Sequence, residues 1–178
     1  MKKKFTGIAA LVAVGVGLAG CAAGGVPGGG SGVALDPDPK PIVIGRAEML
    51  REGGDVTLLG IGKTVATAQS AAERLADAGI EATVIDARFV KPLDAVAIAA
   101  AARRTAGVVT IEDHAAQGGF GSAVLECLAR HAPGTPALVL GIPDEFMEHG
   151  EVAEQWRLAG IDAASVAERT RSWLGGSK

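Results

Sequence analysis

The sequence predicts an α/β fold in which a parallel or mixed sheet is covered by helices on both faces. Short runs rich in Val, Ile and Leu alternate along the chain with longer segments whose apolar residues recur at helical spacing. Most of the short runs are apolar throughout, as expected for strands that are buried on both faces. Strands and helices that alternate in this way pack as a layered α/β domain.

The first elements of the domain are two strands, a helix and a third strand. The strands are expected at 46–51, 56–62 and 82–87. Thr64 is expected to cap the helix, because a threonine hydroxyl accepts hydrogen bonds from the free amides of a first turn. Gly79 is expected to end it, since glycine readily adopts the left-handed conformation that follows many helices.

The rest of the chain continues the alternation. Pro92 and Asp94 open a helix that runs to residue 102, and Cys127 lies on the apolar face of a later helix. The remaining elements are expected as a strand at 108–111, a helix at 122–130, a strand at 137–142, and helices at 151–159 and 163–174. Burial raises the pKa of a thiol, so we expect Cys127 to be structural and not a nucleophile.

Residues 107–125 carry the side chains that are best suited to bind a ligand or to take part in catalysis. The strand of this stretch is followed by three ionisable residues and three glycines: Glu112, Asp113, His114, Gly118, Gly119 and Gly121. Ligands and partners of open α/β sheets meet the carboxyl ends of the strands, so these residues are the candidate contact loop. Two alternatives stay open: a tight turn with solvated charges, or acid–base chemistry. No nucleophile or metal-ligand spacing accompanies them, so we assign no catalytic, cofactor-binding or metal-binding residue.

The first 21 residues have the pattern of a bacterial lipoprotein signal peptide. Three lysines precede a glycine-interrupted apolar run, which ends in Leu18-Ala19-Gly20-Cys21. This string resembles a lipobox, whose cysteine is acylated, and several acyl chains anchor a protein stably. We therefore expect lipid on Cys21 and a location on the periplasmic or cell-surface side of a bacterial membrane. Residues 22–41 are then a flexible Gly/Pro linker, and residues 42–178 are the folded domain.

Charge and composition argue against a nucleic-acid partner. The 178-residue chain has a formal net charge of −3, and aromatic residues make up 3% of it, with no tyrosine. Proteins that bind nucleic acids usually present a basic surface or aromatic platforms on which bases stack. We expect neither from this chain.

Three strings in the domain carry a family resemblance. They are Ala87-Arg88-Phe89-Val90-Lys91-Pro92-Leu93-Asp94, then Thr110-Ile111-Glu112 with Gly118-Gly119-Phe120-Gly121-Ser122, and then Ile142-Pro143-Asp144-Glu145-Phe146-Met147-Glu148-His149-Gly150. In this order they resemble the C-terminal domain of the 1-deoxy-D-xylulose-5-phosphate synthases, which belong to the transketolase family. The resemblance covers roughly residues 42–174. It implies a three-layer α/β/α domain with a five-stranded mixed sheet whose first strand is antiparallel to the others.

The resemblance also implies what the chain does and what it lacks. The synthases are thiamine-diphosphate-dependent transferases of isoprenoid precursor synthesis, and other domains hold the cofactor and its magnesium. The Gly-Asp-Gly string of their metal loop is absent here. We therefore expect no thiamine diphosphate or magnesium on this chain alone, and a lipid-anchored binding or assembly module without catalysis of its own.

Two other functions remain open from the sequence. The chain is then either one subunit of a split transketolase-like enzyme or a lipoprotein that binds a small ligand through Glu112 and His114. Its protein partner is expected to be a chain with the pyrimidine-binding domain or a second copy of itself.

Overall fold

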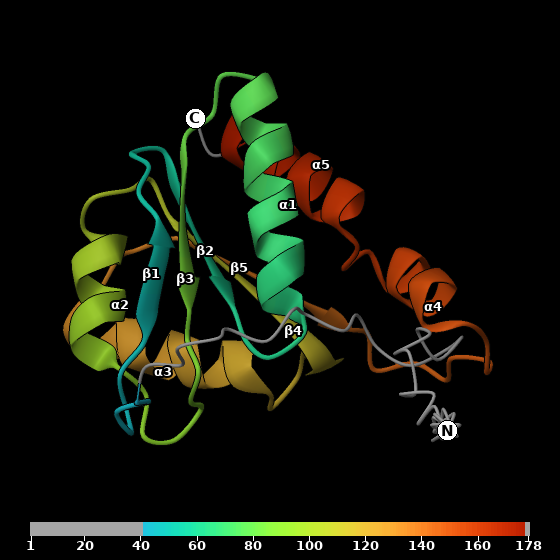
Figure 1. The fold of residues 1–178 in the computed structure, drawn as a ribbon, viewed down its shortest axis with the longest axis horizontal. Coiled ribbons are helices and arrows are strands. Elements are labelled where there is room, and N and C mark those ends of the chain that lie inside the picture. The colour runs from blue at the N-terminus through green and yellow to red at the C-terminus, as the bar shows by residue number, and fades with distance from the viewer. Residues whose placement is uncertain (1–40, 177–178) are drawn as a thin grey trace, which may run out of the picture.

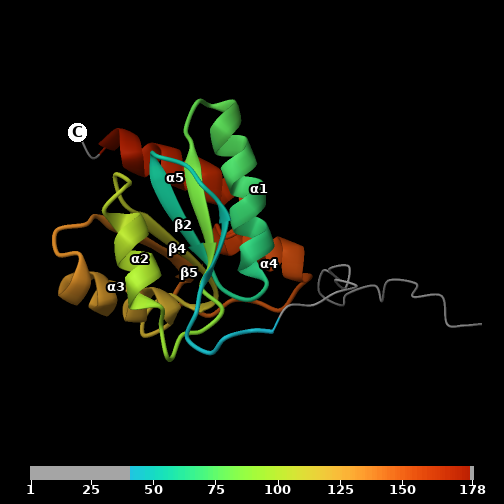
Figure 2. The same cartoon turned by 60° about the vertical axis from the view of Figure 1, so that its left-hand side comes forward.

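In residues 41–176, the range that the computed structural model describes, five strands form one mixed sheet between two layers of helices (Figure 1, Figure 2). The strands lie in the order β1-β3-β2-β4-β5. Helices α1 and α5 pack on one face of the sheet, and α2 and α3 pack on the other. The expected signal peptide, Cys21 and the linker up to residue 40 lie outside the described residues.

The sheet has the predicted mixed arrangement. Its strands are β1 (Glu48–Arg51), β2 (Val56–Gly60), β3 (Ala82–Asp86), β4 (Val108–Ala115) and β5 (Ala137–Ile142). Strands β2 to β5 run parallel, whereas β1 pairs antiparallel with β3, so the expected antiparallel first strand is confirmed. The start of β1 was expected two residues earlier. Gly45 delays it, because this residue has a φ of +75° and turns the chain beside Pro92.

The helices begin and end close to the predicted residues. They are α1 (Thr64–Asp77), α2 (Ala95–Ala102), α3 (Phe120–His131), α4 (Val152–Ala159) and α5 (Ala163–Gly176). Asp94 caps α2 by accepting a hydrogen bond from the Ala97 amide at 3.1 Å. Gly79 follows α1 with a φ of +77°, as expected. The predicted cap of α1 is wrong: the cap residue is Lys63, and the Thr64 hydroxyl donates to the Ile111 carbonyl at 2.6 Å.

Two apolar layers flank the sheet, and successive residues of the central strand β2 pack into one layer and then the other. Leu58 packs with the layer under α1 and α5, whereas Leu59 packs with the layer under α2 and α3, because side chains alternate along a strand. Full burial of one such leucine contributes about 1.5–3 kcal/mol. Cys127 belongs to the second layer, where burial raises the pKa of its thiol against the opposing effect of the Arg130 charge. The structure thus supports a structural thiol.

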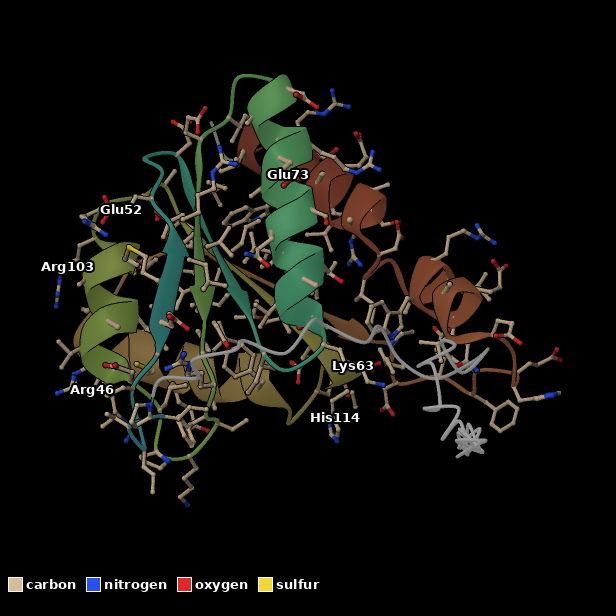
Figure 3. The ribbon with its side chains drawn as sticks, viewed as in Figure 1. Arg46, Glu52, Lys63, Glu73, Arg103 and His114 are labelled. Carbon is tan, nitrogen blue, oxygen red and sulfur yellow. The ribbon has the colours of Figure 1, made fainter. Side chains whose placement is uncertain are left out.

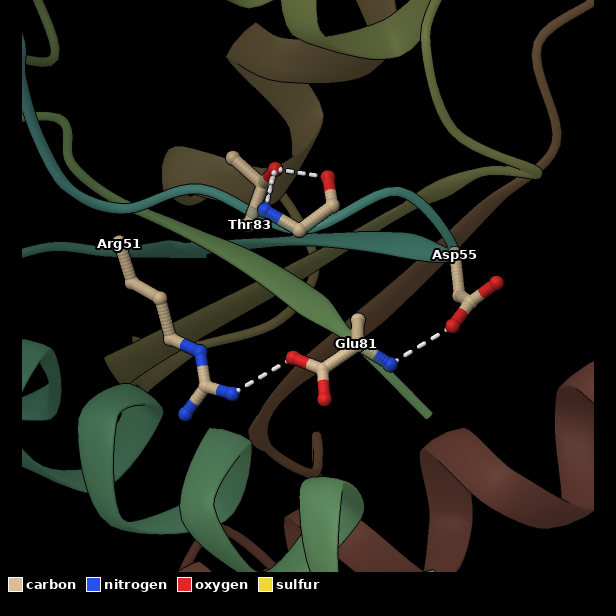
Figure 4. A network of polar contacts seen from close by, with 5 residues as sticks. Arg51, Asp55, Glu81 and Thr83 are labelled. Carbon is tan, nitrogen blue, oxygen red and sulfur yellow. Dashed lines mark hydrogen bonds and ion pairs between the residues drawn. The ribbon is translucent and has the colours of Figure 1, made fainter. Parts of the chain in front are cut away.

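A polar network joins the β1–β2 turn to β3 at the amino end of the sheet (Figure 4). The Thr83 hydroxyl accepts from the Gly53 amide at 3.0 Å and donates to the Gly53 carbonyl at 2.6 Å. The Glu81 carboxylate pairs with Arg51 at 2.8 Å, and the Glu81 amide donates to Asp55 at 2.6 Å. A Cβ on Gly53 would lie 2.5 Å from the Ala82 carbonyl carbon, so this approach requires glycine.

No helix within residues 41–176 is both long and apolar enough to cross a membrane.

Candidate contact site at the carboxyl edge of the sheet

The parallel strands β2 to β5 all end at one edge of the sheet, and a pocket of about 680 Å³ opens there. Its walls come from three strand ends and from the start of α3, which adds Phe120, Ser122, Ala123 and Glu126. Ile61 and Lys63 follow β2, Val90 follows β3, and His114 lies near the end of β4. Figure 3 shows Lys63 and His114 at this edge. Glu112, Asp113, His114, Gly118 and Gly119 of the predicted contact loop all line this pocket, and ligands of open α/β sheets bind at this edge.

Strand β4 is longer than predicted, and the difference changes the context of the candidate residues. The predicted strand stops at residue 111, whereas β4 continues to Ala115 after a register shift against β5. Glu112, Asp113 and His114 therefore lie in the strand and not in a loop. Glu112 lies against the first turn of α3 and is 1% exposed, whereas Asp113 and His114 are exposed.

The buried carboxylate of Glu112 holds the first turn of α3. One oxygen accepts from the Phe120 amide at 2.6 Å, and the other accepts from the Gly121 amide at 2.8 Å. A negative charge is favourable at the amino end of a helix, where several amides lack helical partners. Glu112 thus occupies the place that an external anion would take at this helix. Both of its oxygens accept hydrogen bonds from backbone amides, so the carboxylate stabilises the turn that begins α3.

The three glycines of the turn are required for different reasons. Gly118 has a φ of +74°, a conformation that costs a residue with a Cβ about 1–2 kcal/mol. Gly119 has an ordinary φ of −88°, but a Cβ there would lie 2.1 Å from Glu112 Oε2. A Cβ on Gly121 would lie 2.5 Å from a methyl group of Val139. Positive φ therefore explains the glycine at 118, and close approach to neighbours explains the other two.

Asp113 and His114 face different surroundings. The Asp113 carboxylate accepts a hydrogen bond from the Trp156 indole at 2.9 Å, which ties the end of β4 to α4. His114 Nδ1 lies 3.4 Å from the Ala115 carbonyl, and the ring borders the pocket beside Lys63. Trp156 was missed by the sequence reasoning, because 43 residues separate the partners and no local pattern links them. Whether this region contacts a ligand or partner stays a prediction.

The loop after β5 adds a second feature to the same edge. Phe146 is 95% exposed, and its neighbours Asp144, Glu145 and Glu148 are exposed carboxylates. Met147 packs against the apolar layer under α1 and α5. In the sequence, this loop contributes only to the family resemblance. An aromatic residue among carboxylates in a strand-end loop was the available signal.

Within residues 41–176, no group of three or more His, Cys, Asp or Glu side chains is placed to hold a metal ion.

Sequence comparisons agree with the geometry. The profile of the transketolase C-terminal domain matches residues 45–166. The 1-deoxy-D-xylulose-5-phosphate synthase of Thermomicrobium roseum is 51% identical over 147 residues, which is 83% of this chain and 23% of that protein. Synthase 1 of Geobacter sulfurreducens is 51% identical over 148 residues, with the same coverage. The chain therefore spans about a quarter of the length of these curated relatives.

Solved structures give the same result for the fold. A structure described as "Split gene transketolase, inactive beta4 tetramer" is 35% identical, with a TM-score of 0.71, and the match covers 79% of this chain and 45% of that chain. A transketolase mutant from Pichia stipitis is 18% identical with a TM-score of 0.56, covering 74% of this chain and 18% of the other. The second likeness is one of fold alone.

Proposed function

The chain belongs to the transketolase C-terminal domain family, and we propose that it acts as a lipid-anchored binding or assembly module without catalysis of its own. The observation that carries this proposal is the state of Glu112. It is the buried carboxylate of the candidate site, and both of its oxygens are bonded to backbone amides of α3. A group held in this way stabilises a scaffold and is poorly placed to exchange protons with a substrate.

The anchoring part of the proposal rests on the sequence pattern that ends at Cys21. Lipid on this residue would hold the domain on the periplasmic or cell-surface side of a bacterial membrane, with residues 22–41 as the tether. A tether of this composition leaves the carboxyl edge of the sheet free to meet a partner at the membrane surface.

A second candidate function is that of a subunit in a split transketolase-like enzyme. It is favoured by the 35% identity to a structure described as a split-gene transketolase in an inactive tetramer. A partner chain would then supply the pyrimidine-binding domain and the residues that hold thiamine diphosphate and Mg²⁺. This chain would contribute contacts and stability to such a complex. The complex would then be a synthase of 1-deoxy-D-xylulose 5-phosphate, as its relatives are named, and the family resemblance implies a transferase of isoprenoid precursor synthesis.

A third candidate is a lipoprotein that binds a small ligand in the pocket of about 680 Å³. Pockets of this size accept drug-sized molecules. Lys63 and His114 at its mouth would be the polar contacts, and the engaged carboxylate of Glu112 would contribute little.

Calorimetry and an activity assay on the full chain test the main proposal. Purified chain in detergent micelles is titrated with thiamine diphosphate and Mg²⁺, and then incubated with pyruvate and glyceraldehyde 3-phosphate. We expect no micromolar binding and no release of carbon dioxide, with the Thermomicrobium roseum synthase as the positive control. Cofactor-dependent product above that of heat-denatured chain would refute the proposal. Activity that appears only when a chain with the missing domains is added would favour the split enzyme.

A further inference from the structure

Exposed apolar side chains gather where the chain enters the domain. Ile42, Val43 and Ile44 precede β1 and are 62%, 61% and 75% exposed. The loop between β3 and α2 lies beside them, because a Cβ on Gly45 would lie 3.0 Å from the Pro92 ring (Figure 1, Figure 2). A group of exposed apolar residues of this kind marks a surface that meets a partner.

Basic residues border these apolar side chains. Lys91, in the loop beside them, is exposed and has no ion pair within residues 41–176. The Arg46 side chain is 64% exposed, and Figure 3 shows it at the same end of the fold. The loop also contributes Val90, which is 45% exposed. We call this surface the entry patch, and its members are Ile42, Val43, Ile44, Arg46, Val90 and Lys91.

The carboxylates closest to the entry patch have partners within the domain. Asp94 is 6% exposed, caps α2, and lies 3.8 Å from the Arg46 guanidinium. Glu48 and Asp86 both pair with Arg88. These carboxylates therefore do not cancel the charge of Lys91.

The remaining acidic residues lie to one side or far away. Glu126 shares a pocket of about 480 Å³ with Lys91, and Arg130 of the same pocket balances its charge. The exposed carboxylates between residues 144 and 148 follow β5, which lies at the opposite end of the sheet from β1. Four strand spacings of about 4.8 Å put about 19 Å between these two strands. The entry patch is therefore the apolar and basic end of the carboxyl edge.

The proposed tether ends at the entry patch. Residues 22–41 join Cys21 to Ile42, and a flexible chain of about 20 residues spans about 25 Å on average. A compact domain of this length is about 35 Å across, so lipid on Cys21 would hold the entry patch closer to the bilayer than the far side of the domain. Apolar side chains next to basic ones are also what binds the surface of a bilayer that contains anionic phospholipids.

We propose that the entry patch rests on the membrane that carries the lipid anchor. Residues 42–44 would lie among the lipid headgroups, and Lys91 would meet the phosphate groups of anionic phospholipids. The acidic loop after β5 then points away from the lipid. The inference rests on the proposed lipid anchoring and adds an orientation of the domain on the bilayer.

Fluorescence quenching of the full-length lipidated chain in vesicles tests the proposal. Val43→Cys carries an environment-sensitive fluorophore, and the vesicles contain phosphatidylcholine, phosphatidylglycerol and a lipid with a nitroxide quencher on its acyl chain. Interfacial contacts reach about 5–10 Å into a bilayer, so quenching at residue 43 should be at least about threefold stronger than at Glu73→Cys. Glu73 is the matched control because it is exposed on the outer side of α1 (Figure 3). The parent chain controls for labelling of Cys127, which is buried.

Charge reversal tests the role of the anionic lipid. One basic residue near an anionic surface strengthens binding about fivefold, so Lys91→Glu should lower the ratio of bilayer-bound to free patch by about that factor or more. Arg74→Glu in the last turn of α1 is the matched control and should leave the quenching at residue 43 unchanged. In vesicles of phosphatidylcholine alone, Lys91→Glu should behave like the parent.

Equal quenching at residues 43 and 73 would overturn the inference, and so would an effect of Lys91→Glu no larger than that of Arg74→Glu. A chain with the missing domains that shields residue 43 where the bilayer does not would assign the patch to a protein partner and also overturn it. A chain recovered without lipid would refute the proposed anchoring. The same variants, held on nickel-chelating vesicles by an N-terminal histidine tag, then still decide whether the entry patch meets the bilayer.

Discussion

Gly118 and Gly119 are adjacent, and the structure predicts that a methyl group at each will destabilise the domain by a different mechanism. Gly118 has a φ of +74° with open space around its Cα, so Gly118→Ala meets only backbone strain. Gly119 has a φ of −88° and no such strain. A Cβ there would instead lie 2.1 Å from Glu112 Oε2 and 2.4 Å from the Ala115 carbonyl oxygen, so Gly119→Ala must displace the buried carboxylate.

The expected magnitudes follow from these contacts. The left-handed conformation costs an alanine about 1–2 kcal/mol, which sets the effect of Gly118→Ala. Displacing the carboxylate of Glu112 disturbs two hydrogen bonds, from Phe120 and Gly121, to a charged acceptor. Each such bond contributes about 1.5–3 kcal/mol, so Gly119→Ala should cost about 3 kcal/mol or more. The second substitution should therefore destabilise the domain by about 1 kcal/mol or more beyond the first.

Urea unfolding of the full chain, followed by far-UV circular dichroism, measures both effects as changes in the free energy of unfolding. Gly118→Asn is the matched control, because asparagine tolerates the left-handed conformation and should cost less than alanine at the same position. A larger loss for Gly118→Ala than for Gly119→Ala would refute the reasoning. So would a Gly119→Ala variant as stable as the parent, because the carboxylate of Glu112 would then not lie against this turn.

Three further predictions concern other parts of the chain. Cys21→Ala should abolish metabolic labelling with palmitate and leave the chain unprocessed or trapped at the inner membrane; a variant labelled and sorted like the parent would exclude the lipoprotein signal. Thr83→Val removes the hydroxyl that bonds both backbone groups of Gly53, and should lower the free energy of unfolding by about 1–3 kcal/mol with faster hydrogen exchange at the Gly53 amide. Unchanged exchange there would contradict the network. Burial raises the pKa of Asp162, but hydrogen bonds from Ser165 and Ala164 outweigh it and hold the pKa below its ordinary value. A depressed folded pKa stabilises above the unfolded value, so Asp162→Ala should cost about 1 kcal/mol at pH 7, and its difference from the parent should shrink below about pH 4. A difference that stays constant down to pH 2.5 would contradict this assignment.

Much of the fold was predictable because its signals are local in sequence. Asp94 caps α2 through an amide three residues away, and Gly79 ends α1 through its own backbone conformation. The bounds of β5 agree with the apolar run at Ala137–Ile142. The antiparallel first strand came from the family resemblance, since a pattern of side chains does not state the direction in which an edge strand pairs.

The family and the location of the candidate site also follow from the sequence. The motifs from residue 87 to residue 150 lie in one order along the chain, and a strand with polar residues at its end marks the carboxyl edge of a parallel sheet. These features need no knowledge of which side chains meet across the fold.

The roles of individual residues were decided by the tertiary structure, because they depend on partners far apart in sequence. From the sequence Thr64 is a candidate helix cap, but in the structure its hydroxyl donates a hydrogen bond to the Ile111 carbonyl, 47 residues away. From the sequence Glu112 is a solvated residue at the end of a strand. In the structure it is buried, two amides of α3 compensate the loss of water around its carboxylate, and β4 continues past it. A charged side chain can enter the interior only where donors replace water, and folding alone brings those donors to it.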